Sequence, residues 1–393
     1  MSGLLANQLC RLPVFKSIQE NPSFKRQILA ASVAAGVTAT FGTPVGGVLF
    51  GIEVTSTFFM VYNLWRSFFS AIVAVIVFKL IRATPVINFT VMDPWPFDWS
   101  LSLFAALGVI CGLVSVLFIE WFFFLQRVKQ GKPERWFFTW LMTGRYRWAW
   151  AVTLVLGLLS CPFPAGRPGM APAANDMFLH YALDGSTFST AANGTSISSL
   201  GISSAVPVTA KMLAKVAQWS GGDLNLSLWF NFVYWFFLLL IFVAPSMIVA
   251  TPGGVFMPSF TLGAITGRLF GAIVTHFLPQ YSGQAGWFAV CGAAAMTSGV
   301  TRTVSGVLIV FEVTGQMYLL VPGMLTMLMS HVVASRFAPS IFDAILKMKG
   351  LPMIAWISPA EMQSSSATQA SAIVRFCAKS RASSGAVCGV RSV

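Results

Sequence analysis

The sequence predicts an all-α, polytopic membrane protein, and three of its features support this fold class. Of the 393 residues, 56% are hydrophobic and only 9% are charged, whereas soluble domains carry roughly 25% charged residues. Mean hydropathy is +0.75. The apolar residues also form runs of about the length that a helix needs to cross a bilayer. We therefore expect an integral, multi-pass protein of the plasma membrane or of an organelle membrane.

Eight apolar runs define the predicted helices. They lie at about 27–52, 64–82, 100–125, 147–164, 227–250, 255–278, 285–311 and 317–335. Glycine and proline interrupt the pattern at 42–47 and at 251–254. A broken helix exposes backbone groups that cannot face lipid, so protein or a water-filled path must surround the break. Such breaks often mark an ion or substrate site.

Charge and metal-ligand counts exclude several classes of partner. The net charge is +13, but the Lys and Arg residues lie in short clusters between apolar runs, as expected for loops on the cytoplasmic side of a membrane. Nucleic acid is therefore not an expected partner. None of the six cysteines forms a CxxC pair, and the three histidines are scattered. We expect neither a metal site nor a cofactor.

Residues 29–55 and 288–314 indicate an internal repeat. Aligned without gaps, the two segments share 11 of 27 positions. Two Ala/Gly-rich helices could match by composition, and this explains the alanine matches. Composition does not explain a shared Gly-Val-Leu followed at the same spacing by Glu-Val-Thr, which ends at Glu53 to Thr55 and Glu312 to Thr314. Repeated halves with interrupted helices are typical of transporter folds, whose sites lie at the repeat interface.

The segment 253–260 carries the clearest chemistry. A glycine pair lets the backbone turn, and proline suits the first turn of the helix that follows. That helix is expected to begin inside the membrane, where its unpaired amides and dipole attract an anion. No Lys or Arg stands here, and partial charges can both bind and release a permeating ion. The candidate anion-binding residues are Gly254, Val255, Phe256, Met257 and Pro258.

Two other interpretations of this region were weighed. Gly263, Gly267 and Gly271 are spaced by four, which predicts a close helix-packing face, but this face does not explain the Gly-Gly-x-Phe-x-Pro pattern that precedes it. A membrane-embedded enzyme would need a nucleophile with a nearby base. Ser259 has no histidine near it in the sequence, so no enzymatic activity is expected.

These motifs resemble one family of membrane proteins. Residues 254–258 match the GxFxP signature of the CLC chloride channels and chloride/proton antiporters. Residues 46–56 are similar to that family's helix H, and residues 63–69 to its continuation into the next helix. The resemblance implies an inverted-repeat fold, chloride or another small anion as the solute, and a homodimer with one anion pathway per subunit. The first and last thirds of the chain would supply the subunit contact.

The resemblance covers about residues 1–352, a partial transmembrane domain running from about helix G to helix R. The family's GSGIP loop with its anion-binding serine, and its GKEGP loop with the gating glutamate, have no counterpart, as in a truncated member. By the resemblance, Phe342 takes the place of the pore-lining tyrosine and lacks its hydroxyl. The tail 353–393 has no apolar period and is expected to be disordered, in place of the family's CBS domains.

The residue after Glu53 separates two mechanisms within the family. Antiporters typically carry a second acidic residue there, whereas this chain has Val54, as in the passive channels. A valine cannot take up a proton, so we favour a voltage-gated-type chloride channel over an antiporter or a fragment that assembles only with full-length subunits. Glu53 is either a proton-linked group or a local cap. Glu312, its repeat partner, is expected to be structural.

Overall fold

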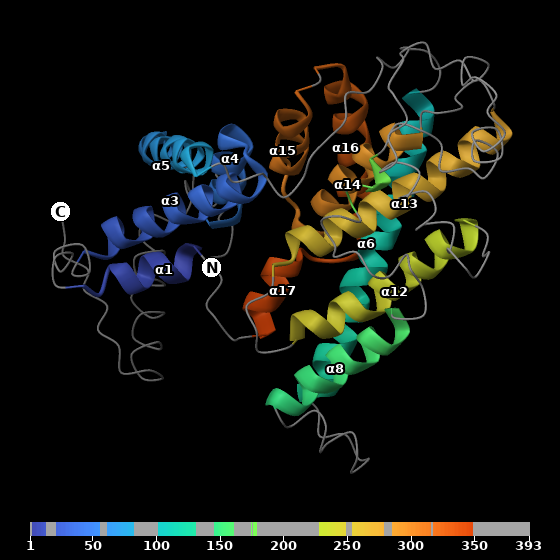
Figure 1. The fold of residues 1–393 in the computed structure, drawn as a ribbon, viewed down its shortest axis with the longest axis horizontal. Helices are drawn as coiled ribbons and strands as arrows, with labels where there is room; N and C mark the ends of the chain where they lie inside the picture. Colours follow the sequence, from blue (N-terminus) through green and yellow to red (C-terminus); the bar gives the residue numbers. More distant parts are fainter. Residues whose placement is uncertain are drawn as a thin grey trace, which may run out of the picture. The chain divides into compact units, whose positions relative to one another are not determined.

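Each predicted apolar run forms one helix or two consecutive helices in the structure, a computed structural model (Figure 1). The structure describes residues 2–12, 21–55, 61–81, 101–130, 145–160, 174, 176–178, 228–248, 254–278, 285–315 and 317–348. In these residues all regular structure is helical. The helices are α1 (Ser2–Leu9), α3 (Pro22–Phe41), α4 (Pro44–Thr55), α5 (Val61–Leu80), α6 (Leu101–Gln130), α8 (Arg145–Ser160), α12 (Leu228–Ile248), α13 (Phe256–Phe277), α14 (Ala285–Thr301), α15 (Ser305–Thr314), the 3-10 turn η6 (Met317–Leu319), α16 (Leu320–Phe337) and α17 (Ile341–Met348).

Two of the predicted runs break into helix pairs. The run 27–52 becomes α3 and α4, and Gly42 stands at the break with φ of 76°, a left-handed backbone that suits glycine. The run 285–311 becomes α14 and α15, and there Arg302 adopts φ of 62°. The first break was predicted from its glycine and proline. The second has neither residue at the break itself, and the sequence pattern missed it.

Hydrogen bonds hold Arg302 in its unusual backbone conformation. Its guanidinium donates to the carbonyl of Gly299 at 2.6 Å and to the carbonyls of Ala334 and Ala338 at the end of α16. A left-handed backbone costs a non-glycine residue about 1–2 kcal/mol. Charge-assisted bonds to three helix-terminal carbonyls offset that cost. In the aligned repeat this left-handed residue stands one position after the equivalent of Gly42.

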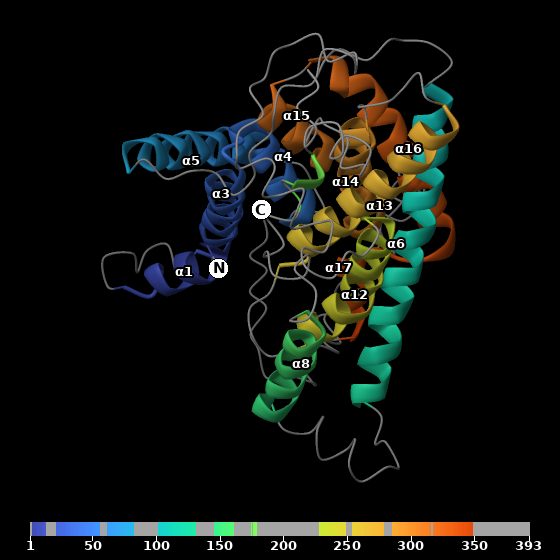
Figure 2. The same ribbon diagram turned by 45° about the vertical axis from the view of Figure 1, so that its right-hand side comes forward.

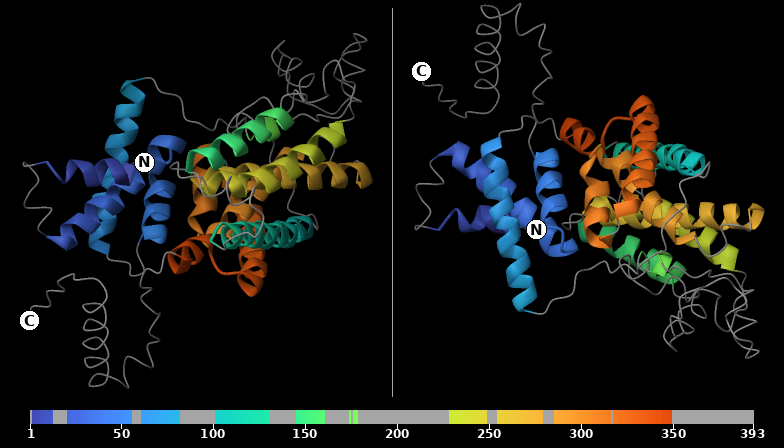
Figure 3. Two further views of the ribbon diagram at one scale, coloured as in Figure 1. Left: turned by 90° about the horizontal axis from the view of Figure 1, so that it is seen from below. Right: turned by 90° about the horizontal axis from the view of Figure 1, so that it is seen from above.

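Helix α14 is the centre of the packing in the first unit, because every one of its residues is buried. It packs against α13, α6 and α16 (Figures 2 and 3). The glycine stripe of α13 makes the closest of these contacts. A Cβ on Gly267 would lie 2.0 Å from the carbonyl oxygen of Phe288, and one on Gly263 would lie 2.5 Å from that of Gly292. The predicted helix-packing face is therefore confirmed.

The two halves of the repeat pack their helix pairs in the same way. A Cβ on Gly47 would lie 2.4 Å from Oγ1 of Thr38, and one on Gly306 would lie 3.0 Å from Oγ1 of Thr297. Both members of each pair occupy equivalent positions in the aligned repeat. Shared glycine–threonine contacts at equivalent positions are not expected from composition alone, and they support a duplicated structure.

The described helices are those of an integral, multi-pass membrane protein. Four segments are long and apolar enough to cross a bilayer, namely Leu101–Val128, Phe230–Met247, Phe256–Phe277 and Leu320–Leu346. Shorter apolar helices include both members of the α4 and α15 pair. Apolar side chains exposed on α6, such as Leu113 and Leu117, suit contact with lipid.

The chain divides into two compact units, Met1–Ile341 and Phe342–Val393. In the second unit the described residues are those of α17, which has Asp343 in its first turn, where a carboxylate favours the positive end of the helix dipole. The predicted domain boundary at residue 352 and the predicted disordered tail 353–393 lie outside the described residues.

Candidate functional site

The candidate anion site lies at the start of α13, which begins at Phe256 as the glycine and proline pattern predicts. Val255 is the N-cap residue, and the first bond of the helix runs from the Ser259 amide to the Val255 carbonyl at 3.2 Å. Pro258 has no N–H to leave unpaired. Three amides therefore lack a partner within the helix, those of Val255, Phe256 and Met257.

The protein's own side chains leave these amides uncapped. Val255 supplies no side-chain cap, and among the described residues no side chain accepts a hydrogen bond from the three amides. The Ser259 hydroxyl points back into the helix, where it donates to the carbonyls of Val255 at 3.0 Å and Phe256 at 2.9 Å.

Aromatic rings surround the Phe256 side chain. Its centroid lies 5.0 Å from that of Phe41 at the end of α3, 5.1 Å from that of Phe50 on α4, and 5.9 Å from that of Phe260 one turn further along α13. The first two contacts are edge-to-face, a favoured aromatic geometry. The first repeat segment and α13 therefore meet at this position, and the ring packing holds the backbone that carries the amides.

Burial increases along the start of α13. Gly254 is exposed, Val255 to Met257 are partly buried, and Pro258 to Thr261 are buried. Residues 251–253, the first three of the four residues of the predicted break, lie outside the described residues. The described part has neither a positive nor a negative side chain. Within this segment, the groups that can attract an anion are therefore the backbone amides.

Glu53 and Glu312 each cap a helix in the opposite half of the repeat. Glu53 of α4 caps the start of α15, and Glu312 of α15 caps the start of α4. Glu53 ends α4, and its carboxylate accepts hydrogen bonds from the Val304 and Ser305 amides at 2.7 and 3.0 Å. The Ser305 hydroxyl adds a third bond at 2.6 Å. A carboxylate at a helix N-terminus satisfies unpaired amides and stabilises the dipole. Local capping, one of the two roles considered for Glu53, is therefore present in the structure.

Glu312 makes the same contact in the opposite direction. It ends α15, and its two carboxylate oxygens accept from the amides of Val45 at 3.1 Å and Gly46 at 2.8 Å, in the first turn of α4. In the aligned repeat, Glu312 is equivalent to Glu53 and these amides to those of Val304 and Ser305. Each helix therefore ends where the other begins, so α4 and α15 run antiparallel, as an inverted repeat requires.

Two further residues, Val54 and Phe342, were predicted to belong to the site. Val54, the residue that replaces a second acidic group, is partly buried on α4. Phe342 lies in the first turn of α17, in the second unit, and is also partly buried. The roles of both residues in the anion pathway stay predictions.

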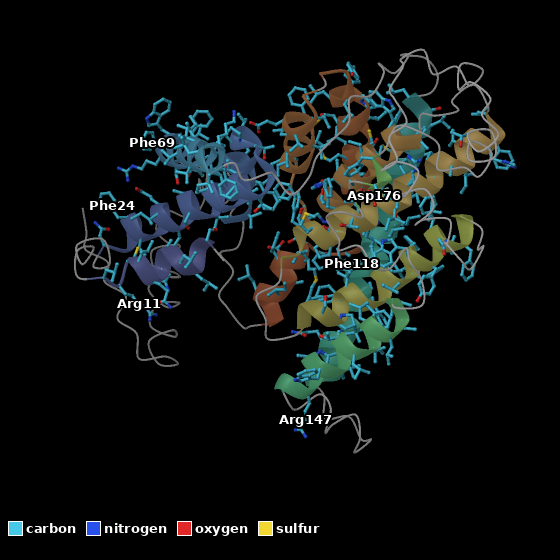
Figure 4. The ribbon with its side chains drawn as sticks, viewed as in Figure 1. Arg11, Phe24, Phe69, Phe118, Arg147 and Asp176 are labelled. Carbon is cyan, nitrogen blue, oxygen red and sulfur yellow. The ribbon has the colours of Figure 1, made fainter. Side chains whose placement is uncertain are left out.

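Sequence reasoning missed a buried polar contact on α13. Arg268 is only 2% exposed, and its guanidinium donates to the Met177 carbonyl at 3.3 Å. Asp176, the residue before Met177, is also buried (labelled in Figure 4). The ring of Phe178, the residue after Met177, packs against that of Phe260 on α13. An arginine inside a predicted span signals a buried partner. That signal could have found the contact between α13 and residues 176–178.

The fold defines a class, that of multi-pass helical membrane proteins with an inverted repeat. Residues 1–335 match the model of a family described as voltage gated chloride channel. The chain belongs to this family, the CLC family.

Known relatives are chloride channel proteins. The chain is 33% identical over 384 residues to chloride channel protein clh-3 of Caenorhabditis elegans, covering 90% of this chain and 37% of that protein. It is 32% identical over 366 residues to chloride channel protein 1 of Homo sapiens, covering 87% and 34%. The chain therefore spans about a third of the length of these curated relatives.

Two solved structures share the fold. The crystal structure of a eukaryotic CLC transporter aligns with a TM-score of 0.63 and 28% identity, covering 88% of this chain and 51% of that one. A slow cyanobacterial Cl⁻/H⁺ antiporter aligns with a TM-score of 0.63 over 89% of this chain and 69% of its own. At 18% identity, the second likeness concerns the fold alone.

Proposed function

We propose that the protein conducts chloride passively across the membrane, and that the amides of Val255, Phe256 and Met257 solvate the ion. The observation that carries this proposal is the start of α13, where three amides meet without a side-chain cap among the described residues. Chloride as the solute is supported by the relatives named chloride channel proteins. Partial charges suit conduction because an ion must leave as readily as it enters.

The surroundings of Phe256 support the same role. Packing by Phe41 and Phe50 holds the helix start in place, and amides that are held in place need not reorient when an anion arrives. Apolar rings also exclude water, which strengthens the attraction of a partial charge for an ion. Phe342 would add a ring edge to the pathway, in the position of the family's tyrosine.

Val54 supports passive conduction over coupled exchange, because its side chain cannot carry a proton. The second candidate is a chloride/proton antiporter, which the likeness to a eukaryotic CLC transporter favours. A third is a subunit that does not conduct alone and assembles with longer family members, since the chain spans about a third of its curated relatives.

The proposal includes a homodimer in the bilayer with one pathway per subunit. Helix α5 exposes a row of large apolar side chains, including Trp65 at 76% and Phe69 at 68%, which would meet the equivalent row of a second copy. Stepwise photobleaching of labelled protein in lipid should give two steps. A single step would contradict the dimer.

Reconstituted vesicles test passive conduction directly. Under a chloride gradient, the reversal potential should equal the chloride equilibrium potential and should stay unchanged when a pH gradient is added. A shift with the pH gradient would favour the antiporter. Absence of chloride current in well-folded protein, with current restored only by a longer family member, would favour the non-conducting subunit.

A further inference from the structure

The hydrogen bonds of Glu53 and Glu312 link the two halves of the repeat in both directions. Each carboxylate lies in the last turn of its helix and accepts two amide bonds from the first turn of the other. Both oxygens of each carboxylate are occupied.

We propose that Glu53 and Glu312 form a reciprocal clamp that joins α4 to α15 and positions Phe50 against Phe256. Glu53 then acts as a fixed cap of α15. The proton-linked role considered for it is not needed. The clamp itself follows from the helix contacts alone, whereas its effect on anions depends on the proposed function.

Close packing explains why the clamp must hold α4 in one register. A Cβ on Gly46 would lie 2.7 Å from Cγ1 and 2.8 Å from Cα of Ile309 on α15, so the two backbones are already at their closest approach. Glu312 bonds to the amide of that same glycine. If this bond is lost, α4 can slide or tilt along α15.

A shift of α4 would move the Phe50 side chain, which contacts Phe256 at the candidate anion site. Phe50 lies four residues after Gly46 on α4, about one helical turn, and its ring contacts that of Phe256. Glu312 is therefore a positioning residue for the helix start, although it does not touch the amides themselves. Glu53 supports the same helix pair from its other end.

Glutamine variants test the clamp with little change in size. A glutamine amide keeps one acceptor oxygen and places an NH₂ group against a backbone amide. Glu53→Gln and Glu312→Gln should each lower the melting temperature in detergent by roughly 2–6 °C. The double variant should lose less than the sum of the two, because either substitution releases the same helix pair. Glu120→Gln is the matched control, since Glu120 is an exposed carboxylate on α6, and its melting temperature should be unchanged.

The ratio of bromide to chloride permeability provides a readout that the amount of folded protein does not affect. Glu312→Gln should change this ratio in the same direction as Phe50→Ala, and Glu120→Gln should leave it unchanged. Melting temperatures of both glutamine variants within about 1 °C of the parent would overturn the clamp. Lower melting temperatures with an unchanged ratio would overturn the positioning role. If the parent protein carries no anion current, the proposed function fails, while the melting data still decide the clamp.

Discussion

Among the described helices, α4, α13 and α15 differ in what their first amides contact. At α4 and α15, a glutamate from the opposite repeat accepts hydrogen bonds from two amides. At α13, no described side chain takes that place. The local physics is the same in all three cases, because a helix start always presents unpaired N–H groups and a positive dipole end.

The difference teaches how one backbone feature can serve two purposes. Where the sequence supplies a carboxylate, the helix start becomes a rigid joint between the repeats. Where it supplies only glycine, proline and aromatic residues, no described side chain caps the helix start, and we propose that an anion binds there. The comparison is tested most sharply by adding a cap to the start of α13 or by disturbing the capped starts of α4 and α15.

The largest effect is expected when α13 receives a carboxylate of its own. In Val255→Asp, the side chain can cap the first turn and place a negative charge where the anion should bind. At about 4 Å, two such charges repel by about 1 kcal/mol in water and about 4 kcal/mol at an effective dielectric constant of 20. Chloride conductance should fall by roughly 5- to 1,000-fold. Val255→Asn, a neutral cap, is the control, and equal loss in both variants would count against an electrostatic site.

A large decrease in the free energy of unfolding is expected when a side chain is added at the close contact between α4 and α15. In Gly46→Val, the new side chain would enter the backbone of Ile309 on α15, with Cβ only 2.8 Å from its Cα. Because backbone cannot move aside cheaply, the free energy of unfolding should fall by about 3 kcal/mol. The fraction of protein that stays monodisperse after heating measures this loss. Gly157→Ala is the control, since a Cβ there meets nothing within 4 Å; equal losses in the two variants would contradict the tight joint.

A smaller effect is expected at Ser305, the repeat equivalent of Gly46. Ser305→Ala removes one hydroxyl bond to Glu53, of 2.6 Å, and keeps both amide bonds. The expected loss is about 1 kcal/mol, measured by the same heating assay. A decrease in unfolding free energy as large as that of Gly46→Val would mean that Glu53 is held mainly by the Ser305 hydroxyl and not by the two amides.

The smallest effect is expected at the far end of α15. Gly315 ends the helix with φ of 64°, and a Cβ there meets nothing within 4 Å. Gly315→Ala should cost about 1 kcal/mol or less, because the left-handed penalty is partly offset by a less flexible unfolded chain. Conductance should not change. A change in conductance would show that the end of α15 is coupled to the pathway.

Most of the helices could be predicted from the sequence because composition and helix length are constrained by the bilayer. The eight apolar runs correspond closely to described helices, and the glycine and proline signals located the break at Gly42 and the start of α13. The break at Arg302 was not predicted, since it depends on carbonyls of α16 that are distant in the sequence. The repeat alignment could have located this second break, because Thr303 is equivalent to Pro44, which begins α4 after the first break.

The candidate site was only partly predictable for a related reason. Residues 254–258 could be selected because they are contiguous and their spacing has a local physical meaning. The aromatic contacts of Phe256 with Phe41 and Phe50 join segments about 200 residues apart, and no local pattern encodes them. The repeat paired Glu53 with Glu312, but their reciprocal caps became visible only when the helix ends were placed together.

The location of a bound halide tests the central claim most directly. Crystals of the protein grown in bromide would reveal the ion by its anomalous scattering. The account predicts a bromide peak within hydrogen-bonding distance of the Phe256 and Met257 amides, and a loss of that peak in Val255→Asp. Bromide peaks found only elsewhere along the pathway would contradict the claim that the start of α13 solvates the permeating anion.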